Sequence, residues 1–197
     1  MFEVRNLGFS YRRTTVLRDV SFVASPGEVV GIVGGNGVGK TTLMRLLATV
    51  IVPDGGAVLS DGVDAFEHPL RYRHQLGYLP EDPQPYEDMT VKEYLSYRAQ
   101  LKGEPTKRVR RRLSEAAEMC RIENLLRSTI RNLSRGQKKR VALADALLLR
   151  PRVLLLDDFL AGLDLEMREV SGAILSEAAA FSSVAWRRLV ISSPALS

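Results

Sequence analysis

Eight residues in the first quarter of the chain have the types and the spacing of a phosphate-binding loop. Residues 34–41 read Gly-Gly-Asn-Gly-Val-Gly-Lys-Thr and match the pattern G-x-x-x-x-G-K-[ST]. Glycines let the main chain wrap closely around phosphate oxygens and point N–H groups at them. The pattern predicts that Lys40 reaches the β- and γ-phosphates of a nucleotide and that the Thr41 hydroxyl ligates Mg²⁺. The candidate binding residues are Gly34, Gly35, Asn36, Gly37, Val38, Gly39, Lys40, Thr41 and Thr42.

A phosphate-binding loop needs an acidic group that holds the metal ion, and residue 157 is the candidate. Residues 153–157 read Val-Leu-Leu-Leu-Asp, so a buried strand would present a carboxylate at its C-terminal end. Open α/β sheets bind their ligands at that end of the strands. We expect Asp157 to hold Mg²⁺ through water. Asp158, the next residue, is expected to face the γ-phosphate and the attacking water.

Strands and helices alternate along the chain in an order that would position these residues. A short β-branched run at 28–33 directly precedes the glycine-rich loop and is typical of a strand buried on both faces. After the loop, a helix is predicted over 42–50 from the helical spacing of its apolar residues Leu43, Leu46, Leu47 and Val50. This alternation predicts an α/β fold with a largely parallel sheet and antiparallel N-terminal strands. The other expected strands are 2–8, 15–24, 57–59, 76–79, 153–156 and 188–192; the other expected helices are 90–126 with a break at 103–105, 135–149 and 166–180; a turn is expected at 54–56.

The sequence pattern changes near residue 85. An acidic linker with three prolines ends there, and the residues that follow are mostly helical in pattern, beginning with a capping box at residues 90–93. We therefore expect a nucleotide-binding core formed by residues 1–84 and 150–197. Residues 85–149 would form a helical sub-domain inserted into that core.

Composition limits the functions that the chain can have. Its 197 residues carry a net charge of +5, and no stretch approaches the 18 apolar residues of a membrane span. The single cysteine, Cys120, allows no internal disulfide. The basic run at 107–112 has two interpretations, a nucleic-acid contact or a solvated helix face. The second is favoured, because no aromatic residue interleaves with the run to stack on bases.

Beyond the phosphate-binding loop, the motifs resemble those of the ABC ATPase family over almost the whole chain. Residues 133–137 read Leu-Ser-Arg-Gly-Gln and resemble the family signature L-S-G-G-Q, with Arg135 in place of the first glycine. Taken alone, this segment would be an ordinary helix N-cap. In the family, the signature closes over the γ-phosphate held by the phosphate-binding loop of a second subunit. The resemblance therefore implies that Ser134, Gly136 and Gln137 bind nucleotide, and that two subunits are required.

Further positions fall where the family places functional groups. Tyr11 lies where an aromatic ring stacks on adenine, although it could instead be a core tyrosine of a strand. Residues 161–164, Ala-Gly-Leu-Asp, resemble the loop that crosses the dimer interface. Glu81 replaces the glutamine of the loop that links the metal site to the transmembrane partner, and it can still approach Mg²⁺. Glu81 and Arg135 together resemble the ABC-2 exporter branch.

Two positions depart from the family pattern. The catalytic glutamate that follows the metal-binding aspartate is replaced by Asp158, whose side chain is one methylene shorter. The switch histidine after the last strand is replaced by Pro194, whose side chain neither donates nor accepts a hydrogen bond. The chain has only two histidines, His68 and His74, and both lie far upstream. These losses indicate slow hydrolysis at the chain's own site.

Three functions follow from this comparison of motifs. The first is a subunit that dimerises around ATP and Mg²⁺ and drives a membrane transporter, working in the cytoplasm on the inner face of the membrane through permease subunits. The second is a nucleotide-binding partner with impaired hydrolysis in a heterodimer. The third, a role in translation or DNA repair, is disfavoured because the chain shows neither a second cassette nor sustained heptads. No nucleic-acid partner is expected.

Overall fold

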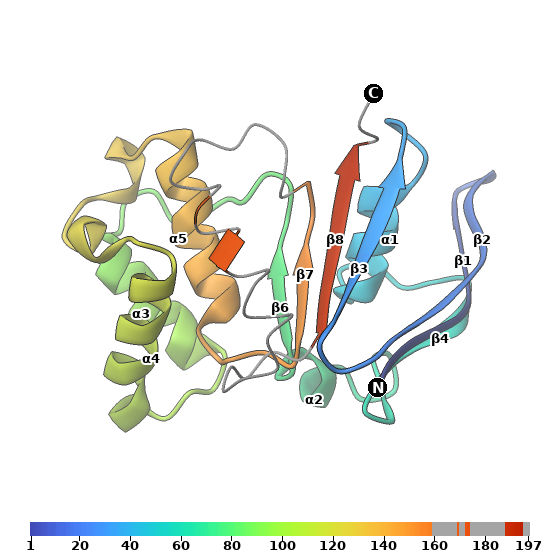
Figure 1. Cartoon of the computed structure of the whole chain (residues 1–197), viewed down its shortest axis with the longest axis horizontal. Helices are drawn as coiled ribbons and strands as arrows, with labels where there is room; N and C mark the ends of the chain where they lie inside the picture. The colour runs from blue at the N-terminus through green and yellow to red at the C-terminus, as the bar shows by residue number, and fades with distance from the viewer. Residues whose placement is uncertain (159–168, 170–171, 174–187, 195–197) are drawn as a thin grey trace.

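A computed structural model describes residues 1–158, 169, 172–173 and 188–194, and these residues form two four-stranded sheets. One sheet is antiparallel, with the order β2-β1-β4-β5, and the other is parallel, with the order β3-β8-β7-β6 (Figure 1). The expected α/β fold with antiparallel N-terminal strands is confirmed.

The antiparallel sheet is built from four strands: β1 (Phe2–Tyr11), β2 (Thr14–Ala24), β4 (Gly55–Ser60) and β5 (Val63–Asp64). Both predicted N-terminal strands are present. The predicted turn at 54–56 is wrong, because two of its residues belong to β4. Gly56 has φ +91°, and a Cβ there would lie 2.5 Å from the main-chain oxygens of Arg5 and Asn6. The close approach of β1, where its register with β4 shifts, requires glycine at this position.

The parallel sheet consists of β3 (Glu28–Gly34), β6 (Leu76–Leu79), β7 (Val153–Leu156) and β8 (Arg188–Pro194). All four match predicted strands, and β3 and β8 extend further than predicted. The predicted burial of 28–33 on both faces is wrong, because Val29 and Val33 of β3 are exposed. Every residue of β7 is buried, as expected for a parallel strand covered on both faces. Because the strands run in the same direction, residues 34, 79, 156 and 194 all lie at one edge of the sheet.

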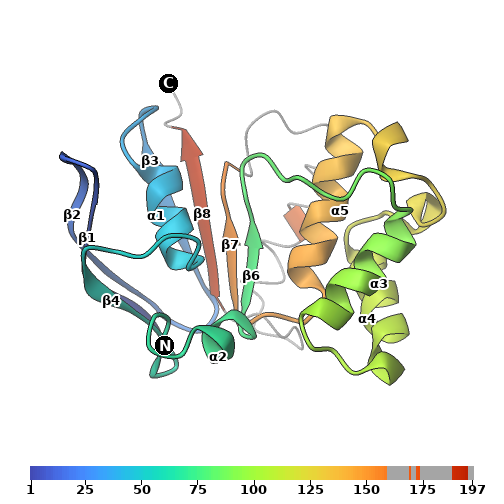
Figure 2. The same ribbon diagram turned by 180° about the vertical axis from the view of Figure 1, so that it is seen from behind.

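Helix α1 (Lys40–Leu47) packs between the two sheets, beside β3 and β8 (Figures 1 and 2). It begins two residues earlier and ends three residues earlier than predicted. Val50 consequently lies beyond the helix and is 60% exposed, so its expected place on the buried face is wrong. The short helix α2 (Pro69–Arg73) caps the far end of α1, where the Tyr72 hydroxyl donates to the Leu47 carbonyl at 2.6 Å.

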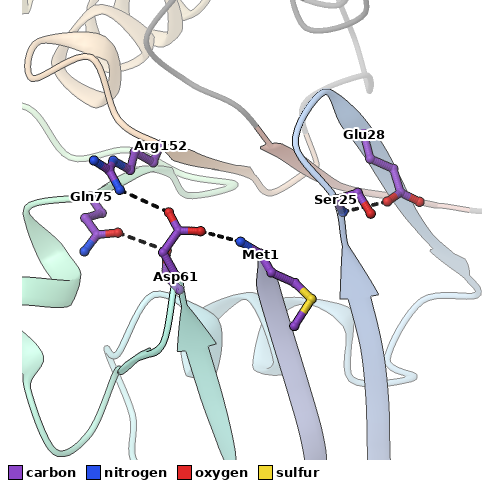
Figure 3. Close-up of polar contacts among 7 residues, drawn as sticks. Met1, Ser25, Glu28, Asp61, Gln75 and Arg152 are labelled. Carbon is purple, nitrogen blue, oxygen red and sulfur yellow. Dashed lines mark hydrogen bonds and ion pairs between the residues drawn. The ribbon is translucent and has the colours of Figure 1, made fainter.

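Polar contacts hold the two sheets together at the end of the molecule that carries the N-terminus. Asp61, in the turn between β4 and β5, forms an ion pair with the N-terminal amine of Met1 (Figure 3). The same carboxylate accepts a hydrogen bond from Arg152, just before β7, at 3.1 Å. Nearby, the carboxylate of Glu28, the first residue of β3, accepts a 2.7 Å hydrogen bond from the main-chain N–H of Ser25, which directly follows β2. Asp61 thus links the antiparallel sheet to the parallel one.

Three helices lie together beyond β6: α3 (Val91–Leu101), α4 (Thr106–Met119) and α5 (Arg135–Leu147) (Figure 2). The short 3₁₀ turns η1 (Glu123–Leu125) and η2 (Ile130–Asn132) connect α4 to α5. The predicted capping box of Thr90 and Glu93 starts α3, and Gly103 forms the predicted break with φ +84°. The predicted continuation of the helix to residue 126 is wrong, because α4 ends at Met119.

The basic run lies on α4, and four of its cations face solvent, namely Lys107, Arg108, Arg110 and Arg111. Only Val109 among these six residues is buried, and Arg112 pairs with Glu104 at 3.3 Å. The run therefore lies on a solvent-exposed face of α4. At 14 residues, α4 is the longest helix in the described ranges. No helix in these ranges is long and apolar enough to cross a bilayer.

Two hydrophobic clusters share strand β7. Val153 and Leu155 pack with the antiparallel strands and α1, whereas Leu154 and Leu156 pack with α3, α4 and α5. Alternate side chains of one strand point to opposite faces of a sheet. Strand β7, which directly precedes Asp157, is therefore packed on both faces. The helix predicted at 166–180 falls almost wholly outside the described residues.

Candidate nucleotide-binding site

The glycine-rich loop connects β3 to α1 at the carboxyl edge of the parallel sheet. Gly37 and Gly39 have φ values of +77° and +101°, and Gly39 is the N-cap residue of α1. A Cβ added to Gly39 would lie 2.8 Å from Cγ1 of Val16, closer than real Cβ contacts. Because Gly39 has no side chain, the loop can lie directly against β2. The N-terminus of α1 follows the loop and faces the space beside it.

Lys40, the first residue of α1, closes the loop. Its Nζ atom donates hydrogen bonds to the main-chain oxygens of Gly34 and Gly35, both at 2.8 Å. These bonds hold the ammonium group beside the loop, at the positive end of the helix dipole. An anion bound here would meet the ammonium and the free main-chain N–H groups of the first turn together.

A cavity of about 450 Å³ brings the loop together with residues distant in the sequence. This volume lies in the range of small-molecule sites. Three carboxylates, one ammonium and the Thr41 hydroxyl line it. The described residues that line the cavity are Tyr11, Val16, Asn36, Gly37, Gly39, Lys40, Thr41, Thr42, Glu81, Asp157 and Asp158. Gly34, Gly35 and Val38 of the predicted set do not line the cavity.

The carboxylates come from the ends of β6 and β7. Asp157 directly follows β7 and is only 1% exposed, and its N–H donates to the Leu79 carbonyl at 2.9 Å. Glu81 follows β6, the neighbouring strand in the sheet. Burial, reinforced by the charges of Asp157 and Glu81, raises the pKa of the nearby Tyr78 hydroxyl to about 12. The parallel register thus places these acids at one edge, as the sequence predicts.

The donor set fits a hard divalent cation that keeps part of its water shell. Carboxylate and hydroxyl oxygens are the ligands that Mg²⁺ prefers, and Mg²⁺ is commonly held by one or two carboxylates together with substrate phosphates. Thr41 and Asp157 offer such oxygens in the cavity. Within the described ranges, no three His, Cys, Asp or Glu residues gather closely enough to hold a metal ion by themselves. The oxygens of Thr41 and Asp157 fit Mg²⁺ bound jointly with phosphate oxygens.

Tyr11 ends β1 at the rim of the cavity. Its side chain is 44% exposed and packs edge-on against Phe9, with ring centroids 4.7 Å apart. The exposed ring excludes the alternative of a core tyrosine. An aromatic face at this rim is available for stacking against a planar group.

The segment at 133–137 starts helix α5, away from the cavity. The Ser134 hydroxyl accepts a hydrogen bond from the Gln137 N–H at 3.2 Å, and the Gln137 side chain accepts one from the Ser134 N–H at 2.9 Å. This capping box starts α5, and both interpretations of the segment require such a helix start. Ser134, Gly136 and Gln137 do not line the cavity that holds Lys40.

The family model described as ABC transporter matches residues 17–161, a span that contains the loop, the carboxylates and the segment at 133–137. The chain belongs to the ABC transporter family.

Known members of the ABC transporter family resemble the chain in sequence and in structure. A molybdate/tungstate import ATP-binding protein, WtpC of Pyrococcus abyssi, is 35% identical over 168 residues, which are 85% of this chain and 48% of WtpC. The chain thus spans about half the length of this curated relative.

Two solved structures share the fold closely. The ATP-binding subunit of an ABC transporter superposes with a TM-score of 0.85 and 31% identity, covering 98% of this chain and 79% of that one. The protein cbiO1 of Clostridium perfringens, part of the ABC transporter complex cbiONQ, gives a TM-score of 0.81 and 30% identity, covering 98% and 77%.

Two family positions lie at the limits of the described residues. The expected interface loop at 161–164 lies outside them. Pro194, which the motif comparison expects in place of the family's histidine, ends β8 and pairs in register with Gly34, the first residue of the glycine-rich loop. Its main chain therefore lies beside the loop.

Motif comparison missed Lys139, on the second turn of α5. Its Nζ atom donates a 3.0 Å hydrogen bond to the main-chain oxygen of Asp158. The neighbouring Lys138 instead pairs with the exposed Glu87 at 2.5 Å. The two adjacent lysines are equivalent in sequence pattern, so only the packing of α5 against the end of β7 distinguishes them.

Proposed function

We propose that the chain is the ATP-binding subunit of a membrane transporter, and that it binds ATP with Mg²⁺ and hydrolyses the nucleotide. The observation that carries this proposal is the single cavity shared by Lys40, Thr41 and Asp157, which come from α1 and from the end of β7. A phosphate chain needs the cation and the main-chain N–H groups, and its magnesium needs the hydroxyl and the carboxylate.

Each lining residue has a role in this proposal. Lys40 neutralises the β- and γ-phosphates, while Thr41 and Asp157 hold Mg²⁺, which supplies charge neutralisation to the transferred phosphoryl group. The main chain of residues 36–42 donates to phosphate oxygens, and Tyr11 stacks on the adenine. Glu81 and Asp158 orient the attacking water.

We also propose that the signature of a second subunit completes the site. The signature residues Ser134, Gly136 and Gln137 start a helix but do not line the chain's own cavity. A helix N-terminus is suited to bind phosphate that is presented by another molecule. Two subunits facing each other would bring each signature to its partner's loop.

The transporter itself would comprise permease subunits, with this chain on the inner face of the membrane. The structural relative cbiO1 belongs to a transporter complex, which supports such a partner. The core would comprise residues 1–84 and 150–197, and the helical sub-domain residues 85–149. The two hydrophobic clusters follow this division except for β7 and Leu79, which contact both parts.

A second candidate function is a partner that binds ATP but hydrolyses it slowly. Asp158 has a shorter side chain than the glutamate of the family, and a displacement of about 1 Å can cost roughly 100-fold in rate. Pro194 adds no side-chain group that could orient water. In a heterodimer, the intact signature would still serve the partner's site.

Titration of the purified protein with a fluorescent ATP analogue, with and without Mg²⁺, tests the proposal. We expect Mg²⁺-dependent binding that Lys40→Met weakens by about 10- to 100-fold, because a charged hydrogen-bond donor is lost. Lys92→Met, which removes an exposed lysine of α3, is the matched control and should bind normally. Absence of binding in the unaltered protein would refute the proposal, and binding without phosphate release would select the second candidate.

A further inference from the structure

Lys139 lies behind the carboxylate end of the cavity and does not line it. Its half-buried side chain extends from α5 to the main-chain oxygen of Asp158, 3.0 Å away. Asp158 does line the cavity. Any effect of Lys139 on a bound ligand must therefore pass through the main chain of Asp158 or through its own charge.

The main chain that Lys139 holds is in an unusual conformation. Asp158 has φ +47°, in the left-handed region that residues other than glycine rarely adopt. Such strained residues persist only where the surrounding structure determines them. The hydrogen bond from Lys139 fixes the direction of the Asp158 carbonyl, and with it the main chain of a residue that lines the cavity.

The charge of Lys139 also acts on the cavity. Among the described residues that line the cavity, the three carboxylates of Glu81, Asp157 and Asp158 accompany one cation, Lys40. Burial lowers the pKa of Lys139, the carboxylates of Asp158 and Glu81 raise it, and the neighbouring Arg135 lowers it. Lys139 thus lies in the field of two of the three carboxylates.

We propose that Lys139 is a positioning residue of the nucleotide site, which fixes Asp158 through its carbonyl and offsets the negative charge of Glu81 and Asp158. The inference rests on the proposed function, because it concerns the same site. Lys139 would connect helix α5, which begins with the signature, to the residues proposed to contact the γ-phosphate and its water. Without this cation, the carboxylates would repel the phosphate chain unless Mg²⁺ were present.

The test compares ATP affinity measured in EDTA with ATP affinity measured in Mg²⁺. Lys139→Met keeps an unbranched side chain of similar length and removes its charge and its hydrogen-bond donor, while Lys139→Arg keeps both. Lys138→Met is the matched control, since it makes the same change one residue away on the same helix, where the lysine pairs with exposed Glu87. Far-UV circular dichroism and thermal unfolding establish that each variant is folded.

We expect Lys139→Met to increase the ratio of the two dissociation constants, EDTA over Mg²⁺, by about threefold to tenfold, the order expected for one screened charge at roughly 10 Å. Lys139→Arg and Lys138→Met should keep the ratio within about twofold of the unaltered protein. A purely structural role would weaken both affinities equally and leave the ratio unchanged.

The inference is overturned if Lys139→Met leaves the ratio unchanged, or if Lys138→Met or Lys139→Arg changes it as much. If Lys139→Met does not fold, Lys139→Gln is measured in the same way and judged by the same ratio. Failure of the proposed function would give a different result, namely an unaltered protein that binds no ATP even with Mg²⁺. The two failures are therefore distinguishable in one series of titrations.

Discussion

The carboxylate of Asp145, on α5, accepts a hydrogen bond from the guanidinium of Arg98, on α3, at 3.0 Å. Lys102, the C-cap residue of α3, donates to the other carboxylate oxygen at 2.7 Å and to the Asp145 carbonyl at 2.5 Å. The Asp145 side chain is only 11% exposed. One buried acid therefore ties two cations of α3 to the helix that carries the signature.

Replacing Asp145 by alanine should destabilise the protein by about 2–4 kcal/mol, because it leaves two partly buried cations without their carboxylate. Urea unfolding followed by circular dichroism measures this loss. Asp88→Ala is the control, since it breaks a largely exposed ion pair with Arg131 and should cost about 0–1 kcal/mol. Equal losses in the two variants would show that the Asp145 cluster is no stronger than a surface pair.

The glycine-rich loop offers a second test, at the N-cap of α1. Gly39→Ala should cost about 2–4 kcal/mol, because it adds overpacking against Val16 to the strain of a positive φ. Gly62→Ala is the matched control: its φ is +79°, but its Cβ would meet nothing within 4 Å. We expect a loss of about 1 kcal/mol there, from strain alone. Urea unfolding of both variants measures the difference, and a Gly39→Ala variant as stable as Gly62→Ala contradicts the close approach.

The slow-hydrolysis hypothesis predicts a gain of function. Asp158→Glu combined with Pro194→His should raise ATP turnover by about 10²-fold, the lower end of what a general acid–base group contributes. Phosphate release by the subunit, assembled with its partners, is the measurement. Asp158→Glu alone is the control that separates the reach of the carboxylate from the missing imidazole. A double variant no faster than the unaltered subunit would remove the basis for this hypothesis.

The only cysteine reports on unfolding. Cys120 follows α4 and is fully buried, and this burial raises the pKa of its thiol. Because the thiolate is the reactive form, a small thiol reagent should label the native protein at least about 10³-fold more slowly than the protein in urea. Quenched labelling followed by mass spectrometry measures both rates. Rapid labelling without denaturant would mean that the cluster around Cys120 opens locally.

Local sequence determined most of the elements, because their signals lie within a few residues. The β-branched run at 28–33, the apolar run at 153–156 and the capping boxes at Thr90 and Ser134 each specify one element by itself. Positions that depend on distant neighbours were predicted wrongly. Gly55 and Gly56 have the composition of a turn but lie in a strand, because the close approach of β1 needs their missing side chains.

For the candidate site, too, some features could be predicted from local sequence and others depended on packing. The glycine-rich loop and Asp157 could be identified from spacing alone, since phosphate and metal chemistry requires those residue types in that local order. The sequence could not decide that Tyr11 is exposed at the cavity, or that Lys139 reaches Asp158 while Lys138 reaches Glu87. Those outcomes depend on how a strand end and a helix pack against the sheet. Packing is set by contacts between segments far apart in the chain, and no local pattern records them.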